Sequence, residues 1–359
     1  MGKKLRVATV FSGIGAPEQA LNKLGIEYEI VFACDNDEIE IDKTYEEIIK
    51  DFEASDYNDI KDYVNDLYTA TKKPKYVKQS YFANYDIDEE RWHPDIRFLD
   101  GKKYKNKVDI FIGGSPCQSF SLMGKRAGLE DTRGTLFYEY ARLINEMQPK
   151  VFLYENVPGM LVHDNGNTWK VISEVFDSLG YKYEKDILNS KDFGIPQDRK
   201  RLFVVGIKNN KNFSFPLPTG LTTTMFDYLE DTVDSRHYLG KKGFEFVTNN
   251  PGRARVNQKI IRTQKANQQF NWNGDFVFEE YDKIKNDEKI LKRAYIGTYC
   301  GKKGVIRQLS YRECMRLMGF SDDYRIVVPN VPAYRQAGNS IVVNVLEEII
   351  NKILEVVEF

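Results

Sequence analysis

Short apolar runs alternate with amphipathic, helix-spaced segments along the first 207 residues of the chain. Each run is bounded by glycine, proline or charged residues, which is typical of buried strands. Strands that alternate with helices form parallel sheets covered by helices on both faces. The pattern therefore predicts a doubly wound α/β domain. The expected strands are Leu5–Phe11, Tyr28–Ala33, Val108–Ile112, Val151–Tyr154 and Leu202–Ile207.

The alternation stops after residue 207. Between Asn209 and Gly304 the sequence breaks into short segments with proline, glycine and asparagine, which predicts a second, smaller domain. Helical patterning returns over residues 307–320, where Ser310 and Glu313 have the spacing of a capping box. Two domains agree with the length of 359 residues, because a domain usually holds roughly 100–200 residues.

The composition excludes several classes of protein. No apolar run approaches the roughly 20 residues of a membrane span, and the chain leads straight into a strand, so we expect a cytoplasmic protein without a membrane partner. Four scattered cysteines and three histidines disfavour a zinc site or a disulfide framework, and we expect no metal. The net charge of −1 argues against a protein that coats nucleic acid non-specifically, but it does not exclude one basic surface.

The segment Gly113–Ser121, with the sequence Gly-Gly-Ser-Pro-Cys-Gln-Ser-Phe-Ser, follows an expected buried strand. Its cysteine, Cys117, is preceded by a proline and surrounded by small hydroxyl residues. A cysteine at the end of a strand is poorly placed for packing and well placed for nucleophilic attack. The alternative is a buried cysteine that acts as a small hydrophobic residue.

Two glycines, Gly13 and Gly15, stand at the turn from the first strand to the first helix, where they let a ligand approach the backbone. The third glycine of the dinucleotide fingerprint is replaced by Glu18, which disfavours NAD and a dehydrogenase. Asp35 follows about 20 residues later, where a ribose hydroxyl pair would be held. A helix-capping role is the alternative for this aspartate.

Other charged residues stand at expected strand ends. Glu155 ends one strand, and it is either a positioned carboxylate or a hydrogen-bonding loop residue. Gln197, Arg199 and Arg201 alternate as the chain enters another strand, so they would project from one face. Surface ion pairs are the alternative for these arginines.

Two segments differ from the rest in charge. Residues 46–66 hold eight acidic residues and two lysines with apolar residues at helical spacing, which we interpret as a solvated helical insertion. Residues 252–274 carry five basic residues and no acidic ones, interleaved with asparagine and glutamine. Because cations bind phosphates and amides read base edges, this second segment favours contact with nucleic acid over a merely solvated face.

Seven short motifs stand in one order along the chain. They are Phe11-x-Gly13-x-Gly15, Gly-Gly-Ser-Pro-Cys117-Gln, Arg133-Gly-Thr-Leu136-Phe, Glu155-Asn-Val, Gln197-x-Arg199-x-Arg201, Arg307-x-Leu-Ser-x-Arg-Glu-Cys-x-Arg-Leu-Met-Gly-Phe320 and Ala-Gly338-Asn339-Ser340. Together they resemble the motifs of the cytosine-C5 DNA methyltransferases. The resemblance covers nearly the whole chain except the acidic insertion and residues 209–304. Small departures from the family pattern occur at Ala16, at Asp35-Asn36-Asp37 and at Ser310.

The resemblance implies a Rossmann-like catalytic domain that transfers a methyl group to C5 of cytosine. Cys117 is then the thiolate that adds to C6, and cysteine suits this step because it is intrinsically nucleophilic. Glu155 would protonate or hydrogen-bond N3 of the base. Arg199, and with it Arg201, would orient and electrostatically support the base. The target cytosine must be flipped out of the duplex, since none of these groups reaches a stacked base.

The resemblance also implies S-adenosylmethionine as cofactor, with S-adenosylhomocysteine as product. The expected cofactor residues are Phe11, Gly13, Gly15, Asp35 for the ribose, Asp95 and Ile96 for the adenine edge, Pro116, Leu136, Asn339 and Ser340. Because the last motif returns to the first lobe, the catalytic domain should be discontinuous. The expected divisions are residues 1–208 plus 325–359 for catalysis, 209–306 for target recognition and 307–324 for a connecting helix or hinge.

Double-stranded DNA is the implied partner, read by the variable region that contains the basic segment. The loop Ser121–Arg126 is expected to close over the flipped base. The residues expected at the DNA are Ser121, Lys125, Arg126, Arg133, Gln197, Arg253, Arg255 and Arg262.

Restriction–modification or phage self-protection is the implied context, with a monomeric enzyme and, where one exists, a restriction endonuclease that acts separately. Two alternatives of the same fold stay open. An RNA cytosine-C5 methyltransferase would have a shorter, weakly basic variable region. A catalytically silent DNA-binding homologue should lack Cys117 or Glu155, and both are present.

Overall fold

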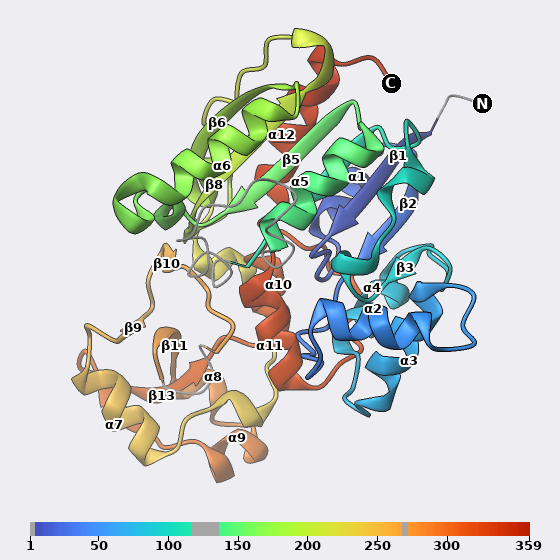
Figure 1. Ribbon diagram of the computed structural model, residues 1–359. Helices are drawn as coiled ribbons and strands as arrows, with labels where there is room; N and C mark the ends of the chain where they lie inside the picture. Colours follow the sequence, from blue (N-terminus) through green and yellow to red (C-terminus); the bar gives the residue numbers. More distant parts are fainter. Residues whose placement is uncertain (1–3, 117–135, 268–271) are drawn as a thin grey trace. The chain divides into compact units, whose positions relative to one another are not determined.

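The structure is a computed structural model that describes residues 4–116, 136–267 and 272–359 (Figure 1). The chain divides into two compact units. Unit 1 takes in the residues up to Leu188, Lys200–Leu217 and Leu346–Phe359. Unit 2 takes in Asn189–Arg199 and Pro218–Val345.

Unit 1 is built on a sheet with the strand order β3-β2-β1-β4-β5-β8-β6. Its strands are β1 (Leu5–Val10), β2 (Tyr28–Cys34), β3 (Trp92–His93), β4 (Ile110–Gly113), β5 (Val151–Asn156), β6 (Lys182–Asn189) and β8 (Lys200–Ile207). The strands from β3 to β5 pair in parallel, which confirms the expected α/β class with a central sheet.

The sheet is not parallel throughout. β8 runs antiparallel to β5, so the sheet is mixed, which the expectation of a parallel sheet did not include. β6 lies at the edge of the sheet and is mostly exposed or half-buried. Its many charged residues give no apolar run, and the sequence pattern therefore missed it.

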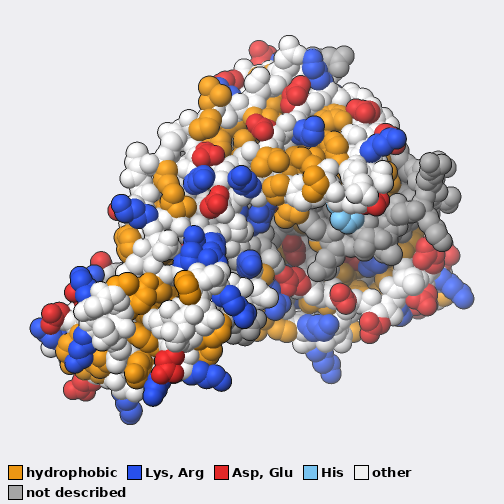
Figure 2. Space-filling view, turned by 90° about the vertical axis from the view of Figure 1, so that its left-hand side faces the viewer, with side chains coloured by type: hydrophobic (Ala, Val, Ile, Leu, Met, Phe, Trp, Pro, Cys, Tyr) orange, Lys and Arg blue, Asp and Glu red, His pale blue; other side chains and the backbone are white. Residues whose placement is uncertain are grey.

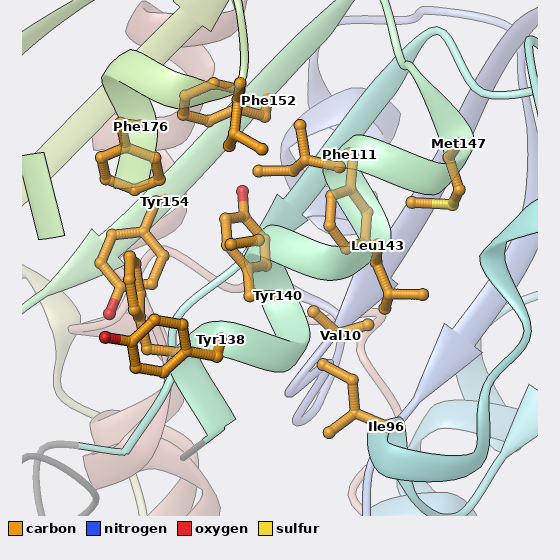
Figure 3. Close-up of a cluster of buried hydrophobic side chains, with 14 of the residues drawn as sticks. Val10, Ile96, Phe111, Tyr138, Tyr140, Leu143, Met147, Phe152, Tyr154 and Phe176 are labelled. Atoms are coloured by element: carbon orange, nitrogen blue, oxygen red, sulfur yellow. The ribbon is translucent and has the colours of Figure 1, made fainter. Parts of the chain in front are cut away.

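Helices accompany the strands of unit 1. They are α1 (Ala16–Lys23), α2 (Tyr45–Glu53), α3 (Ile60–Ala70), α4 (Tyr76–Asn84), α5 (Leu136–Met147), α6 (Asn167–Ser178) and α12 (Val343–Val356), the last of which begins in unit 2. Figure 3 shows aromatic side chains of α5 and α6 against β4 and β5. Phe111 stacks on Tyr140 with ring centroids 4.8 Å apart, and Phe152 stacks on Phe176 at 5.1 Å. Burial of each such ring stabilises the fold by about 1.5–3 kcal/mol.

The acid-rich segment forms the two helices α2 and α3. The expected helical insertion is present, but it is not merely solvated, because Ile48, Val64 and Tyr68 are buried together with Phe98. The N-terminus of α2 has a capping box in which Thr44 accepts a hydrogen bond from the backbone of Glu47. The insertion therefore has a small core of its own.

Unit 2 is built on a second sheet with the order β12-β13-β11-β9, beside a short pair β10-β7. Its strands are β7 (Gln197–Asp198), β9 (Ala254–Val256), β10 (Ile261–Arg262), β11 (Gly274–Glu280), β12 (Gly297–Tyr299) and β13 (Lys302–Gln308). Its helices are α7 (Lys241–Asn249), α8 (Tyr281–Ile284), α9 (Glu288–Arg293), α10 (Tyr311–Arg316) and α11 (Asn330–Asn339). The core between α7 and the sheet includes Phe244, Val256, Phe276 and Ile306.

The capping box at the start of α10 is confirmed. Ser310 Oγ accepts a hydrogen bond from the backbone N–H of Glu313 at 3.1 Å, and the Glu313 carboxylate accepts one from Ser310 N at 2.7 Å. The helix is shorter than the pattern predicts, because residues up to Gln308 belong to β13. Arg307, which was expected in the helix, belongs to this strand instead. It forms an ion pair with Glu313 at 2.8 Å, and both side chains are buried.

The compact units follow other boundaries than the expected functional domains. Residues 189–199 and 307–345 pack within unit 2. Gln197 shows why, because its side-chain amide donates to the carbonyl oxygen of Leu317 at 2.8 Å and accepts from the backbone N–H of Gln264 at 2.9 Å. These long-range bonds tie the start of unit 2 to its later helices.

Candidate active site

The candidate site lies at the edge of the unit 1 sheet where β1, β2, β4 and β5 end. β1 pairs with β2 on one side and with β4 on the other, so the strand order reverses between β1 and β4. Doubly wound sheets bind ligands outside the carboxyl ends of the strands at such a reversal. Because β8 is antiparallel to β5, the first residues of β8 reach the same edge.

The turn after β1 has an unusual backbone. Phe11, Gly13 and Gly15 have φ angles of 53°, 53° and 77°, in the left-handed region that side chains other than glycine rarely adopt. A Cβ atom on Gly15 would lie 2.1 Å from the ring of Tyr85. The Tyr85 hydroxyl donates to the Gly15 carbonyl oxygen at 2.6 Å. Gly15 is therefore required by its own backbone and by the close approach of this ring.

Asp35 follows β2 and is bonded to the glycine turn. Its Oδ2 accepts a hydrogen bond from the backbone N–H of Gly13 at 2.9 Å, and its Oδ1 accepts one from Asp37 at 2.9 Å. Burial raises the pKa of the Asp35 carboxyl, and these two backbone bonds act in the opposite direction. The carboxylate is thus held in one orientation beside the turn.

Asp95 follows β3 and caps a short 3-10 helix, Ile96–Phe98. Its carboxylate accepts hydrogen bonds from the Arg97 guanidinium, with Nη2 to Oδ2 at 2.6 Å, and from the Tyr68 hydroxyl at 3.1 Å. Ile96 is buried, and Leu136, the first residue of α5, packs partly buried against the same core. Both expected adenine-edge residues are therefore fixed in unit 1.

This set of groups fits the expected cofactor chemically. Carboxylates at Asp35 and Asp95 accept hydrogen bonds, as ribose hydroxyls and an adenine amino group require. Phe11, Ile96 and Leu136 supply apolar surface for a flat ring, and all five belong to unit 1.

The end of β4 is fastened to β5. A Cβ atom on Gly114 would lie 2.6 Å from the Glu155 carbonyl oxygen and 3.0 Å from Glu155 Oε2. Ser115 Oγ lies 2.7 Å from the Tyr154 hydroxyl, and the Asn156 amide donates to the Ser115 carbonyl at 2.9 Å. The segment that leads through the exposed Pro116 toward Cys117 thus starts from a fixed point against the Glu155 carboxylate.

Glu155 forms an ion pair with Arg201, the second residue of β8. Glu155 Oε1 lies 3.1 Å from Arg201 Nε, and the two side chains are 15% and 17% exposed. Both residues belong to unit 1. The pair therefore stands at the carboxyl edge, largely shielded but still reached by solvent.

Arg199 and Gln197 belong to unit 2. The Arg199 guanidinium is buried and donates to the carbonyl oxygens of Gln264 at 2.9 Å, Gly338 at 3.1 Å and Ser340 at 2.7 Å. Gln197 is fully buried, and its amide is bonded within the unit, which argues for a structural role in place of the expected DNA contact. Arg201 belongs to unit 1, because the division between the two units falls between positions 199 and 200.

Asn339 is the last residue of α11, and Ser340 follows it. Ser340 is the C-cap of α11, and its carbonyl accepts the bond from Arg199. Asn339 is exposed. A Cβ atom on Gly338 would lie 2.4 Å from the backbone of Lys265 and Ala266, so this glycine permits close backbone packing in unit 2.

The expected DNA-binding arginines differ in how firmly they are held. Arg255 pairs with Asp275 at 3.1 Å, while the Arg262 guanidinium donates to the Gly252 carbonyl at 2.9 Å. Arg253 is exposed and lies over the Phe246 ring at 5.5 Å. Figure 2 shows basic and acidic side chains interspersed on one face of the molecule. The expected residues Cys117, Ser121, Lys125, Arg126 and Arg133 lie outside the described residues.

A model of the C-5 cytosine-specific DNA methylase family matches residues 63–355 of the chain. The chain belongs to this family. As a member, it is a DNA (cytosine-5-)-methyltransferase, in agreement with the resemblance of its motifs.

Curated relatives of this methylase come from bacteria and phages. The orphan methyltransferase M.SPRI of Bacillus phage SPR is 33% identical over 295 residues, which is 74% of this chain and 58% of that protein. The type II methyltransferase M1.ScrFI of Lactococcus lactis subsp. cremoris is 35% identical and covers 79% of this chain and 71% of its own. The type II methyltransferase M.HhaI of Haemophilus parahaemolyticus is 34% identical, with 77% of this chain and 83% of its own covered.

Solved structures of other methyltransferases share the fold of this methylase. The Entamoeba histolytica methyltransferase EhMeth matches with a TM-score of 0.68 at 15% identity and covers 99% of both chains. The S. pombe Dnmt2 methyltransferase matches with a TM-score of 0.65 at 19% identity, over 98% of this chain and 99% of its own. Among the residues that the structure describes, no helix of the methylase is long and apolar enough to cross a bilayer.

The hydrogen bonds of Glu18 in the methylase could not be expected from the sequence, where this residue only stands in place of a glycine. Glu18 is fully buried in α1, where its Oε1 accepts hydrogen bonds from the Tyr81 hydroxyl at 2.5 Å and from Thr9 at 3.3 Å. Burial raises the pKa of Glu18 to about 7. The spacing of Tyr81 and Tyr85 could have indicated that both hydroxyls lie on one side of a helix, because residues four apart share one helix face.

Proposed function

We propose that this methylase transfers the methyl group of S-adenosylmethionine to C5 of a cytosine in a specific sequence of double-stranded DNA. The observation that carries the proposal is the placement of Glu155, which is paired with Arg201, directly against Gly114, three residues before Cys117 in the sequence. The proposed base-activating carboxylate therefore lies beside the end of β4, the strand that precedes the proposed nucleophile in the sequence.

Cys117 is the proposed nucleophile. Its thiolate forms a bond to C6 of the flipped cytosine, and the electron pair of the 5,6 double bond moves toward N3 and C5. Glu155, in protonated or proton-sharing form, donates a hydrogen bond or its proton to N3, which stabilises the negative charge that develops on the ring. After C5 is methylated, a base removes the C5 proton, the double bond re-forms and the thiolate leaves.

Arg201 has the supporting role in this scheme. Its guanidinium holds the Glu155 carboxylate and supplies positive charge beside the base. Arg199 is assigned to the packing of unit 2, since its guanidinium is used by three carbonyl groups there.

S-adenosylmethionine, when bound, supplies an electrophilic methyl group on sulfur. Asp35 would hold the ribose hydroxyls and Asp95 the adenine edge, while Phe11, Ile96 and Leu136 would line the ring. The glycine turn permits close approach of the ligand to the backbone. Pro116, Asn339 and Ser340 remain in the proposed set on the resemblance of their motifs.

Residues 209–306 are proposed to select the DNA target, with Arg253, Arg255 and Arg262 near phosphates or bases. The loop Ser121–Arg126 is proposed to cover the flipped cytosine, with Arg133 beside it. Curated relatives named as type II and orphan phage methyltransferases support a role in restriction–modification or phage self-protection.

Bisulfite sequencing of host DNA after expression of the chain tests the reaction, the substrate and the target sequence together. We expect protected cytosines in one short sequence context. Duplex DNA with 5-fluorocytosine at that position should trap a covalent adduct, because fluorine at C5 cannot leave as a proton.

Cys117→Ser should abolish transfer while DNA binding stays measurable. Cys300→Ser, at an exposed cysteine of unit 2, is the matched control and should retain activity. Normal turnover by Cys117→Ser would disprove the mechanism, and methylation of RNA in place of DNA would favour the RNA alternative.

A further inference from the structure

The two ends of the helical insertion meet at Asp37, close to the proposed cofactor edge of the sheet. The chain departs after Asp37, forms α2 and α3, and returns at the start of α4. There the Asp37 carboxylate accepts hydrogen bonds from the backbone N–H groups of Val77 and Lys78. Residues 38–75, which we call the insertion, are therefore a closed excursion anchored two positions after the proposed ribose ligand Asp35.

Within the insertion, Tyr68 reaches the proposed adenine ligand. Its hydroxyl donates to Asp95 Oδ2 at 3.1 Å, and both residues are buried, at 3% and 6% exposure. Phe98, three residues after Asp95, is part of the insertion's core and stacks on Tyr45 with ring centroids 5.2 Å apart. The segment that carries Asp95 is thus packed against the insertion on one side.

The sheet side of the same segment is held by α5. The Arg142 guanidinium donates to the carbonyl oxygens of Ile96 and Leu99, both at 3.0 Å. These bonds fix the backbone, whereas Tyr68 and Arg97 bond to the carboxylate itself. Arg97 follows Asp95 almost directly in the chain, so Tyr68 is the contact to this carboxylate that comes from a separate part of the fold.

We propose that the insertion is a cofactor-affinity element and that Tyr68 is its positioning residue. The Tyr68 hydroxyl fixes the rotamer of Asp95, so that one carboxylate oxygen faces the 6-amino group of the adenine ring. The proposal rests on the proposed function, which assigns Asp95 to the adenine edge. It gives the acidic insertion a role in binding rather than in catalysis.

The test compares two ligands by titration calorimetry with the full chain: S-adenosylhomocysteine and S-inosylhomocysteine, which lacks the 6-amino group. Tyr68→Phe keeps the buried ring and removes only the hydroxyl. We expect it to weaken S-adenosylhomocysteine by about 5- to 20-fold, as for a lost hydrogen bond to a charged group. The affinity for S-inosylhomocysteine should change by less than about two-fold, and kcat at saturating S-adenosylmethionine should hold.

Two further variants make the test specific. Tyr57→Phe removes another hydroxyl of the insertion, which bonds to Asp66 at the surface, and should leave both affinities unchanged. In Asp95→Asn the addition of Tyr68→Phe should cause little further loss, since coupled residues are not additive.

Several outcomes would overturn the proposal. Equal losses for both ligands would show that Tyr68 only stabilises the fold, and unfolding of Tyr68→Phe at a much lower temperature would accompany that result. An unchanged affinity for S-adenosylhomocysteine would show that Tyr68 does not act on the site. A wild-type chain that binds neither ligand would disprove the proposed function itself, which separates that failure from the failure of this inference.

Discussion

The two halves of the site edge hold their carboxylates differently. On the proposed cofactor side, Asp35 accepts hydrogen bonds from the backbone N–H groups of Gly13 in the glycine turn and of Asp37. On the proposed transfer side, Glu155 pairs with the side chain of Arg201, and both remain partly exposed. Backbone donors cannot change their charge or move far. The first arrangement therefore suits binding, and the second suits a group that must exchange a proton during reaction.

The largest expected effect is on the rate of methyl transfer, and it comes from a substitution at Glu155. Glu155→Gln keeps the shape of the side chain but removes its proton chemistry, so single-turnover methyl transfer should slow by about 100- to 1000-fold. The dissociation constant for S-adenosylmethionine, measured by calorimetry, should change by less than about two-fold. A variant that loses cofactor affinity and rate in parallel would contradict the separation of the two halves.

The next effect is structural and lies on the cofactor side. Gly15→Ala should destabilise the chain by about 3 kcal/mol, because the new Cβ meets the Tyr85 ring and the backbone is left-handed. Gly25→Ala is the matched control, since Gly25 has a φ of 66° but no atom within 4 Å of a new Cβ. Denaturant unfolding should show only about 1 kcal/mol of loss there. Equal losses would mean that the contact with Tyr85 is unimportant.

Asp35→Asn should weaken cofactor binding and leave the rate of transfer nearly unchanged, which is the reverse of the result expected for Glu155→Gln. Asparagine replaces one acceptor oxygen by a donor group, so it cannot accept from both Gly13 and Asp37. We expect S-adenosylmethionine to bind about 10- to 50-fold more weakly, as for the loss of a hydrogen bond to a charged group. The rate at saturating cofactor should stay within about three-fold. A main effect on the rate would move Asp35 into the chemical step.

The smallest effect depends on pH. Burial raises the pKa of Glu18 from its ordinary value of 4.5 to about 7, so the folded chain holds this proton more tightly than the unfolded chain. The contribution of Glu18 to stability is thus largest at low pH and declines as the pH rises toward 7. Because glutamine does not titrate, the stability of the wild type relative to Glu18→Gln should fall by about 1–2 kcal/mol between pH 5 and pH 8. Urea unfolding at both pH values measures this, and a constant difference would contradict the raised pKa.

The parts of the fold that follow from local pattern could be predicted from the sequence. The strand before the glycine turn and the capping box at Ser310 depend on nearby residues, and the structure has both. The direction of β8 could not be predicted, because an apolar run reads the same for a parallel and an antiparallel strand. β6 has too many charged residues to stand out at all.

The contacts of the candidate site that could not be predicted from the sequence are those between residues far apart in the chain. Alternation predicts that Arg199 and Arg201 share one face, but it does not report that Arg199 is bonded within unit 2 while Arg201 pairs with Glu155 in unit 1. The bond from Tyr68 to Asp95 spans 27 positions and depends on how α3 packs, which no local pattern reports. The burial of Glu18 could not be predicted either, because its carboxylate is bonded to Tyr81 of α4, 63 positions later in the chain.

The bond from Tyr85 to Gly15 has a consequence for the order in which the protein matures. It closes a loop of 70 positions, and the bond from Tyr81 to Glu18 closes one of 63. Contacts of this span form only after much of the intervening chain is available. A nascent chain that has not yet released residue 85 from the ribosome lacks the clamp on its glycine turn. The turn therefore gains these two bonds only after α4 has been synthesised, although the residues of the turn itself are made much earlier.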